Sequence, residues 1–401
     1  MSPAAPAAPR VPRASRVPLF DVVVAGGGPA GAAAALALAR AGRTVLLADA
    51  GRGPAPVGEA LPAAARVLLR DLGADGVLTH GHLPCLANRS AWGGPALGST
   101  DSILDPHGHG WHLDRPLFDR RLRDRARAQG VTLATGTAAR PLERTADGGW
   151  TVALGGREPV RCRWIVDATG RRAAVATACG ARRLVSDRLL AVHLTLGPTA
   201  HPADTTTTVE AAPDGWWYTA PLPAGRRLLA RYTDADLPAA HRTALPAGLA
   251  ATRHIGPLAA AHPWPPAATP RRAPAHTARL DTVHGDGWTA AGDAALAFDP
   301  LSSQGILTAL FTGLSAGTAV HAHLAGDPGA LPGYARTVDQ VRATYLRNHR
   351  THYAAEQRWP DRPFWQRRHT PAPQEARARA PHPSPTPSAP TPPTGTATAS
   401  C

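Results

Sequence analysis

The sequence contains no lysine: all 43 basic residues in its 401 positions are arginine. Reactions that need a lysine amine, as a nucleophile or in a Schiff base, are therefore excluded. Cysteine is scarce too. The four cysteines, Cys85, Cys162, Cys179 and Cys401, lie far apart and form no C-x-x-C pair. This distribution argues against a zinc site or a disulfide framework and indicates a reducing, cytoplasmic location.

Long apolar runs are also missing. No stretch of about 18 apolar residues is present, so we expect no transmembrane span. Residues 1–18 lack the continuous apolar segment of a secretory signal. Residues 1–18 and 371–401 are rich in proline, alanine, serine and threonine, and we expect both to be disordered tails.

The formal net charge is +14, which raises the question of a nucleic-acid partner. The arginines are dispersed, however, and no basic stripe is interleaved with aromatic residues, so none is expected. A local excess of positive charge lies in Arg336–Arg379, which contains ten arginines and four acidic residues. Two interpretations stay open: a solvated face of a C-terminal helical segment (326–370), or a docking surface for an acidic peptide or protein.

The clearest motif is a strand, a glycine loop and a helix. Residues 20–25 are an apolar run that suits a buried parallel strand. The loop reads Gly26-Gly27-Gly28-Pro29-Ala30-Gly31, and a strong helix former follows. Gly26 allows the tight turn, Gly28 allows a pyrophosphate to approach, and Gly31 allows close helix–strand packing. Asp49 ends the next strand, where an acid binds an adenosine ribose, so the segment predicts dinucleotide binding.

Two later segments narrow the choice of cofactor. One strand ends in D-A-T-G at Gly170, and another ends in G-D-A-A, with Gly292 and Asp293. With the glycine loop, they resemble the flavoprotein monooxygenase superfamily that includes para-hydroxybenzoate hydroxylase and the flavin-dependent halogenases. The resemblance implies FAD as cofactor. It places Ala168 and Gly170 beside the nucleotide and implies that Asp293 hydrogen-bonds the ribityl chain of FAD.

Two further segments extend the resemblance. The run Phe298–Ile306 begins a helix whose N-terminus would face the flavin pyrimidine edge, where its partial positive charge stabilises a reduced ring. Gly305 and Ile306 are therefore assigned to the cofactor and Ser303 to catalysis. The element beginning at His112 resembles a D-R-x-x-F-D-x-x-L helix that lies against FAD and implies a cofactor contact for Arg115. The alternative for Arg115 is an ion pair with a surface acid.

Several segments are candidates for substrate binding. Glu59, in a G-E-A-L-P element, is a candidate catalytic residue or a plain helix-start acid. Large aromatic side chains would stack on an aromatic substrate, although ordinary core packing is an equal alternative for each. The candidate substrate residues are Trp92, Trp111, His112, Trp216 and Trp217, with Trp217 also a candidate for catalysis. No metal is expected at H-x-H-x-x-H, because its loop lacks a carboxylate cluster.

The predicted fold class is α/β, with a Rossmann-type FAD-binding domain on a parallel sheet and an interleaved smaller substrate domain on a mainly antiparallel sheet. The predicted FAD-binding domain is discontinuous, comprising residues 19–57, 100–185 and 276–325. The predicted substrate domain comprises residues 58–99 and 186–275.

The sequence departs from the halogenase pattern in two places. Halogenases carry W-x-W-x-I-P where this chain has W-W-Y-T-A-P, and they use a lysine that is absent here. The remaining motifs are similar to those of halogenase-like maturases that hydroxylate a tryptophan within a protein or peptide.

The resemblance therefore implies an FAD-dependent monooxygenase that hydroxylates an electron-rich aromatic through a flavin C4a-hydroperoxide. Oxygen is the co-substrate. Because no second G-x-G-x-x-G occurs, NAD(P)H would bind transiently or a partner flavin reductase would supply electrons. Three alternatives stay open: a flavin dehydrogenase or reductase, a halogenase-like enzyme, and a non-catalytic flavoprotein that binds a peptide.

Overall fold

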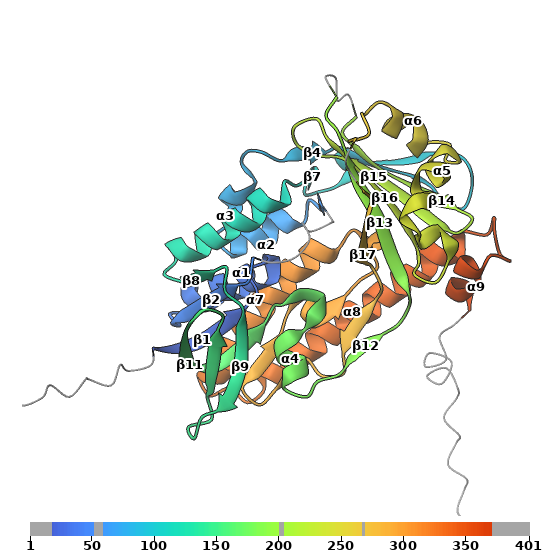
Figure 1. Cartoon of the computed structure of the whole chain (residues 1–401). Helices are drawn as coiled ribbons and strands as arrows, with labels where there is room; N and C mark the ends of the chain where they lie inside the picture. The colour runs from blue at the N-terminus through green and yellow to red at the C-terminus, as the bar shows by residue number, and fades with distance from the viewer. Residues whose placement is uncertain (1–17, 52–58, 200–203, 267–268, 371–401) are drawn as a thin grey trace, which may run out of the picture.

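The computed structural model describes residues 18–51, 59–199, 204–266 and 269–370. The predicted tails, apart from Pro18, lie outside these residues. Figure 1 shows two main sheets, one in each half of the molecule, with long helices between and beside them. The α/β class and the combination of a parallel with a mainly antiparallel sheet are confirmed.

The half of the molecule that contains the glycine loop is here called the nucleotide half. It is built on a parallel sheet with the order β20-β11-β1-β2-β8, and β19 pairs antiparallel to β20. These strands are β1 (Leu19–Ala25), β2 (Val45–Asp49), β8 (Thr132–Thr135), β11 (Arg157–Asp167), β19 (His284–Gly285) and β20 (Trp288–Ala290). β9 (Ala139–Arg144) and β10 (Trp150–Leu154) extend β11 antiparallel.

Both faces of this sheet are covered, which explains why its strands are continuous apolar runs. Val22 and Val24 point to one face and pack against helices α1, α3 and α7, whereas Val23 and Ala25 point to the other face, beside α4. These helices are α1 (Pro29–Arg40), α3 (Arg115–Ala128), α4 (Ala174–Ala178) and α7 (Gly305–Leu324). The short helix α2 (Ala65–Asp71) lies beside α7.

Helix α7 is held against α1 by small residues. A Cβ added at Gly313 would overlap the carbonyl oxygen of Ala30, and one added at Gly317 would press on Ala34 and Ala37. Within the described residues α7 is the one helix long and apolar enough to cross a membrane, and half of the relevant stretch is buried inside the molecule. Its apolar character is therefore accounted for by packing against α1 in the core.

The second half is a seven-stranded sheet with the order β17-β13-β16-β15-β14-β5-β6, antiparallel except between β14 and β5. These strands are β5 (Ala87–Ala91), β6 (Gly98–Asp101), β13 (Leu189–Leu196), β14 (Thr206–Ala212), β15 (Gly215–Pro221), β16 (Arg227–Asp234) and β17 (Arg271–Pro274). Helices α5 (Leu245–Ala250) and α6 (Ile255–Ala260) cover one face, here called the outer face. The opposite, inner face packs against Leu301 and the C-terminal helices.

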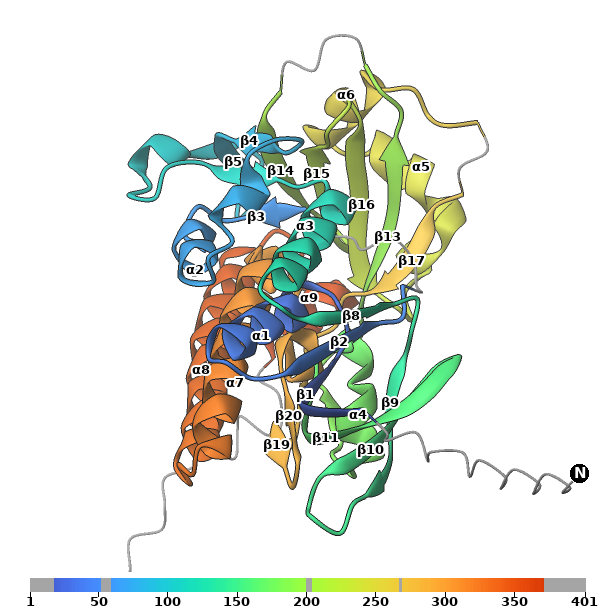
Figure 2. The ribbon, with the colours of Figure 1, turned by 90° about the vertical axis from the view of Figure 1, so that its left-hand side faces the viewer.

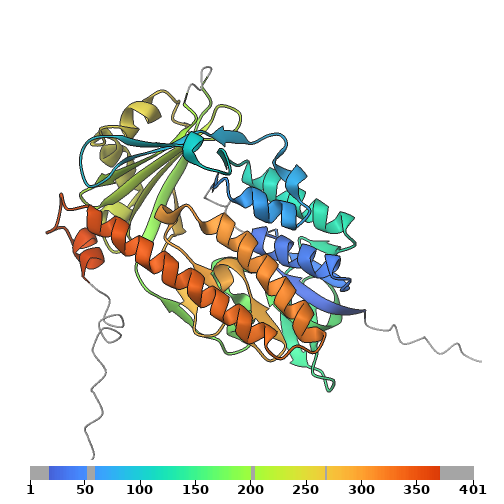
Figure 3. The ribbon, with the colours of Figure 1, turned by 180° about the vertical axis from the view of Figure 1, so that it is seen from behind.

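Two small sheets join the halves: β3-β7-β4 and β12-β18-β21. Their strands are β3 (Ala60–Leu61), β4 (Leu83–Cys85), β7 (Gly110–His112), β12 (Arg183–Val185), β18 (Ala278–Leu280) and β21 (Leu296–Ala297). The long helix α8 (Ala330–Ala355) runs from the nucleotide half to the seven-stranded sheet and is followed by α9 (Pro363–His369), as Figure 3 shows. Leu331 and Val338 pack in the nucleotide half, whereas Tyr353 packs on the inner face.

Candidate functional site

The glycine loop between β1 and α1 has the shape that a dinucleotide requires. Gly26 has φ +109°, and a Cβ there would overlap the carbonyl oxygen of Ala168. A Cβ on Gly31 would overlap the carbonyl oxygen of Gly26. At Gly28, in contrast, a Cβ would meet no atom within 4 Å. The loop is tightly packed behind and open in front, where phosphates would approach the N-terminus of α1.

Asp49 ends β2 beside this loop and has a partner that the sequence analysis missed. Nη1 of Arg123, on α3, lies 3.4 Å from Oδ2 of Asp49 and donates a hydrogen bond of 3.0 Å to the carbonyl oxygen of Gly27. Arg115, the predicted cofactor residue on α3, forms an ion pair of 3.3 Å with Asp119. The alternative stated for Arg115, pairing with an acid, is therefore present. No local pattern singles out Arg123, because α3 carries six arginines.

The D-A-T-G segment borders the glycine loop: the Ala168 N–H donates to the Ala25 carbonyl oxygen at 2.8 Å. Its aspartate is structural. Oδ2 of Asp167 accepts the N–H groups of Val175 and Ala176 at 2.9 and 2.8 Å, which caps α4. Gly170 follows with φ +68°. The segment thus forms a rigid wall beside the loop.

Asp293 lies in a 3-10 turn (Gly292–Ala294) at the carboxyl end of β20. Gly292 has φ +61°, and a Cβ there would press on Ala30, so this turn also touches the glycine loop. The Asp293 side chain is 40% exposed and its Oδ2 lies 3.6 Å from Nε of Arg171. Arg171 also donates a hydrogen bond of 2.9 Å to the carbonyl oxygen of Phe298. Arg171 was not among the predicted residues, although it directly follows D-A-T-G.

Residues 298–306, here called the flavin loop, lead into α7. A 3-10 turn (Pro300–Ser302) is followed by Ser303, whose φ of +50° is unusual for a residue with a side chain. Gly305 is exposed at the first position of α7, and Ile306 is buried. The predicted residues of this segment therefore lie together at one helix N-terminus.

The described residues fit FAD. The open approach at Gly28 suits a pyrophosphate, the carboxylate of Asp49 suits a ribose, and the half-exposed carboxylate of Asp293 suits a ribityl chain. Gly305, at the start of α7, is exposed, and the first N–H groups of a helix have no partner within the helix. All four features lie at the carboxyl edge of the parallel sheet, where ligands bind in open α/β sheets.

The prediction for Trp217 was wrong. Successive side chains on a strand point to opposite faces, so Trp216 and Trp217 of β15 cannot line the same pocket. Trp217 points to the outer face, where it packs beneath Leu245 and Ile255 with the Arg231 guanidinium 5.3 Å from its ring centroid. It therefore faces away from the flavin loop and has neither the catalytic nor the substrate position assigned to it.

The other three tryptophans are packed against protein groups rather than gathered in one pocket. Trp216 stacks on Tyr232 at 3.9 Å. The Trp92 indole N–H donates to the His352 carbonyl oxygen at 2.7 Å, and its ring meets Tyr353 edge-on. Trp111, on β7, lies under the guanidinium of Arg66 at 4.3 Å. The alternative of core packing describes all three.

Two tyrosines that the sequence analysis did not select lie on the inner face, Tyr218 on β15 and Tyr232 on β16. Burial, and next the negative charge of Glu59, raise the pKa of both hydroxyls, so both stay protonated. Glu59 itself is buried, at 7% exposure, immediately before β3. The inner face thus contains two buried, protonated tyrosines. The signal was available, because residues 216, 218 and 220 alternate toward one face.

His112 is fully buried on β7, and its Nε2 lies 3.3 Å from the carbonyl oxygen of Thr205. Burial lowers the pKa of His112 to about 4, so the ring is neutral at physiological pH. Its Nδ1 has no hydrogen-bond partner in the described part of the chain. The other two histidines of the motif lie elsewhere: His107 is exposed and His109 packs against Trp111. Across residues 18–51, 59–199, 204–266 and 269–370, no three or more His, Cys, Asp or Glu side chains are grouped to hold a metal ion.

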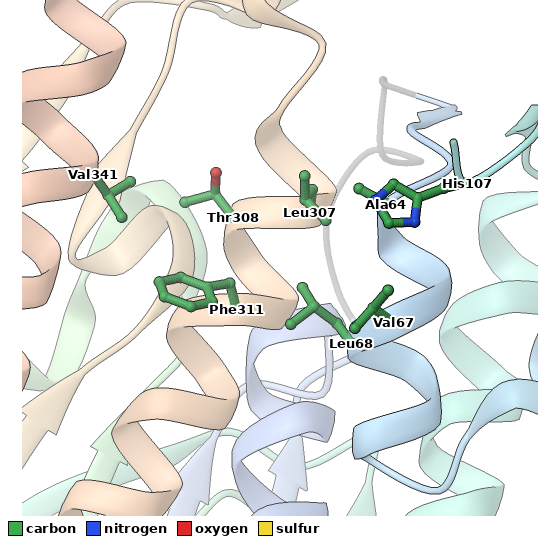
Figure 4. A pocket seen from close by; sticks show the side chains of 8 residues that line it. All are labelled: Ala64, Val67, Leu68, His107, Leu307, Thr308, Phe311 and Val341. Carbon is green, nitrogen blue, oxygen red and sulfur yellow. The ribbon is translucent and has the colours of Figure 1, made fainter. Parts of the chain in front are cut away.

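An apolar groove of about 420 Å³ lies between α2, α7 and α8 (Figure 4). Its walls are formed by Ala64, Val67, Leu68, His107, Leu307, Thr308, Phe311 and Val341. Leu307 and Thr308 belong to the first turn of α7, so the groove begins beside the flavin loop. None of the predicted substrate residues lines it.

The arginine-rich C-terminal segment is partly used inside the fold. Arg358 pairs with the buried Glu356, and Arg367 and Arg368 pair with the buried Asp234. Arg367 and Arg368 join α9 to β16, and Arg358 joins the segment after α8 to β5 by donating to the Ala91 carbonyl oxygen, so these three arginines are engaged inside the fold.

The fold and this site are those of a flavoprotein, with a parallel-sheet half that fits FAD and a second, mainly antiparallel sheet. A family model described as tryptophan halogenase matches residues 70–380, and the chain belongs to this family. It is a flavin-dependent oxidoreductase, and membership implies the use of FAD and O₂.

Relatives span nearly the whole chain. FAD-dependent oxidoreductase LodB of Marinomonas mediterranea is 28% identical over 87% of this chain and 97% of the relative. Flavin-dependent halogenase gsfI of Penicillium aethiopicum is 26% identical over 81% of this chain and 69% of the relative.

Solved structures show the same fold. The peptidyl tryptophan dihydroxylase QhpG, essential for tryptophylquinone cofactor biogenesis, has a TM-score of 0.72 and 28% identity over 87% of this chain and 78% of its own. The myxobacterial chondrochloren halogenase CndH has a TM-score of 0.78 at 22% identity, covering 90% of this chain and 89% of its own. At this identity CndH shows the fold alone.

Proposed function

We propose that the protein is an FAD-dependent monooxygenase that hydroxylates an electron-rich aromatic ring, and that a tryptophan within a peptide or protein is its substrate. The observation that carries the proposal is the absence of lysine from a chain of the tryptophan halogenase family. The halogenases that this chain resembles use a lysine to pass on hypohalous acid. Without that amine, oxygen transfer to the ring is the better-supported reaction. The likeness to a peptidyl tryptophan dihydroxylase supports the choice of substrate.

The roles proposed for the cofactor residues follow from their positions. Gly26, Gly28, Pro29, Ala30 and Gly31 would cradle the pyrophosphate, Asp49 would bind the adenosine ribose, and Asp293 the ribityl chain. Ala168 and Gly170 would flank the nucleotide, and Gly305 and Ile306 would present the N-terminus of α7 to the ring. Bound FAD supplies the activation of O₂.

The protein groups position the substrate and exclude water. Tyr218 and Tyr232, both protonated on the inner face, would offer hydroxyl groups to the ring-bearing substrate. The groove between α2, α7 and α8 has the size and apolar lining of a ligand site and begins at the first turn of α7. It would receive the apolar part of a peptide substrate.

Electrons would come from NAD(P)H bound transiently or from a partner flavin reductase. A cytoplasmic location, inferred from the dispersed cysteines, would supply both.

The test is turnover with isotopically labelled O₂. The holoenzyme receives reduced flavin from a flavin reductase, together with either a tryptophan-containing peptide or free tryptophan, in buffers with and without bromide. The expected result is a peptide that has gained labelled oxygen, whether or not bromide is present. A brominated product would establish halogenation instead, and substrate oxidation under anaerobic conditions with another electron acceptor would establish a dehydrogenase. Oxygen transfer to free tryptophan alone would overturn the peptide assignment.

A further inference from the structure

Asp299 organises the flavin loop. Its Oδ1 accepts the N–H of Leu301 at 2.9 Å, and its main-chain carbonyl oxygen accepts the Ser302 N–H at 3.2 Å and the Ser302 hydroxyl at 3.0 Å. The side chain is only 1% exposed. A carboxylate buried to this degree is unfavourable unless other groups compensate it. The groups that hold Asp299 therefore decide whether the loop keeps its shape.

Those groups come from one face of α8. Tyr345, His349 and Tyr353 are spaced four residues apart, so they lie in one row along the helix. The Tyr353 hydroxyl donates to Oδ2 of Asp299 at 2.7 Å, and Nε2 of His349 lies 3.3 Å from the same oxygen. The Tyr345 hydroxyl accepts the Asp299 N–H at 3.1 Å.

Contacts beyond the carboxylate reinforce this row. The Phe298 ring stacks on Tyr345 at 4.1 Å and 12°. Burial alone would raise the pKa of Asp299, but the hydrogen bond and charge of His349, with smaller contributions from Leu301 and Tyr353, lower it. The carboxylate is thus ionised and fully satisfied where it lies.

The same face of α8 also reaches the seven-stranded sheet. The Tyr353 hydroxyl accepts the indole N–H of Trp216 at 3.0 Å, and Trp216 stacks on Tyr232. Tyr353 therefore bonds to the flavin loop on one side and to the inner face on the other. Such a buried, satisfied network has one preferred geometry.

We infer that this face of α8 positions the flavin loop: Tyr345, His349 and Tyr353 act through Asp299 on residues 300–306 and set the distance between the cofactor ring and the inner face. They are positioning residues, because each acts on the cofactor through another residue. The inference rests on the proposed placement of the flavin against this loop.

The experiment compares histidines three residues apart on α8. His349→Leu removes the group beside Asp299, whereas His352→Leu, the matched control, changes an exposed side chain. For each purified protein, circular dichroism first establishes folding. The FAD dissociation constant is then measured by fluorescence titration, and the flavin midpoint potential is measured on the holoenzyme. His349→Leu is expected to weaken FAD binding about tenfold, because the buried Asp299 carboxylate loses a hydrogen bond and the flavin loop loses its fixed position.

Two further variants separate positioning from general stability. His349→Gln keeps a hydrogen-bond donor toward Asp299 and is expected to restore FAD affinity to within about threefold of wild type. Asp299→Asn keeps an acceptor for the Leu301 N–H but loses the charge, and its effect is expected not to add to that of His349→Leu. The midpoint potential is expected to shift in His349→Leu and to stay unchanged in His352→Leu.

The outcomes divide clearly. A folded His349→Leu protein with unchanged FAD affinity and potential would overturn this inference and leave the proposed function standing. Fully additive effects of His349→Leu and Asp299→Asn would also overturn it. Wild-type protein that takes up no FAD would overturn both this inference and the proposed function.

Discussion

The glycines of the glycine loop have different roles, and the structure distinguishes them. Gly26 and Gly31 are required by the protein itself, since side chains there would overlap backbone oxygens. Gly28 is surrounded by open space and has φ −76°, which any residue can adopt. A requirement for glycine at Gly28 therefore comes from the ligand.

This difference leads to a prediction for two alanine variants. Gly28→Ala is expected to change the free energy of unfolding of the apoprotein by less than about 0.5 kcal/mol, while FAD affinity falls at least about tenfold. Gly31→Ala is expected to destabilise the apoprotein by about 1–3 kcal/mol because the loop must shift. Urea denaturation and FAD titration of both variants provide the measurement. Equal destabilisation of the two apoproteins would contradict the assignment.

His112 gives a prediction about pH. Burial lowers its pKa from 6.5 to about 4, so the unfolded chain binds a proton at a higher pH than the folded chain does. Folding is then weakened as pH falls from 6.5 toward 4, by roughly 2 kcal/mol at pH 5. The variant His112→Phe is expected to lose this part of the pH dependence. Urea denaturation of both proteins at pH 7 and pH 5 measures it. Parallel losses of stability between the two pH values would refute the assignment to His112.

At the scale of elements, α7 and α1 depend on each other through small residues. Gly313→Val would force a side chain against the Ala30 carbonyl oxygen. We expect a loss of about 1–3 kcal/mol in unfolding free energy. We also expect weaker FAD binding, because Ala30 belongs to the glycine loop. Thr318→Val, on the exposed side of α7, is the matched control and should change neither quantity. The measurement is chemical denaturation with FAD titration, and a stable Gly313→Val protein would refute the close packing.

The nucleotide-binding elements were predictable because their signals are local. The strand at 20–25, the glycine loop and the helix after it follow one another directly, and the structure has β1 and α1 there. The adjacent Trp216 and Trp217 lie on one strand, β15, but were both predicted to bind substrate. Alternation along a strand forbids this, and which of the two faces inward depends on α5 and α6, far away in sequence.

Other parts of the site could not be predicted from spacing. All of α7 and much of α8 lie between Asp299 and its partners His349 and Tyr353 in the sequence, so no local pattern links the flavin loop to α8. Trp216, Tyr232 and Tyr353 come into contact only once β15, β16 and α8 have come together. Long-range pairing of this kind is decided by tertiary packing, which a single sequence does not display.

At the scale of the whole molecule, the C-terminal helices hold the two halves together. α8 packs on the nucleotide half at its start and on the inner face at its end, and α9 closes over that face with Phe364 and Trp365. The arginines of this region are therefore partly structural. An acidic partner, one of the two interpretations of this region, would have to use the exposed remainder, such as Arg336 and Arg347.

Arg368 is expected to be the most important residue for holding α9 against the inner face. Its guanidinium is 7% exposed, donates to both carboxylate oxygens of the buried Asp234 at 2.8 and 3.2 Å, and lies 3.5 Å from the Phe364 ring centroid. Arg368→Leu would leave Asp234 to Arg367 alone, and removing one partner of a buried pair costs about 3 kcal/mol or more.

We therefore expect Arg368→Leu to lower the free energy of unfolding by about 3 kcal/mol and to expose α9 to proteases. Arg362→Leu, an exposed position next to α9, is the matched control. Urea denaturation combined with limited proteolysis provides the measurement. A loss below about 1 kcal/mol, as found for exposed ion pairs, would mean that the aromatic contacts of Phe364 and Trp365 hold α9 without the arginine. The seven-stranded sheet would then be joined to α9 by apolar packing rather than by charge.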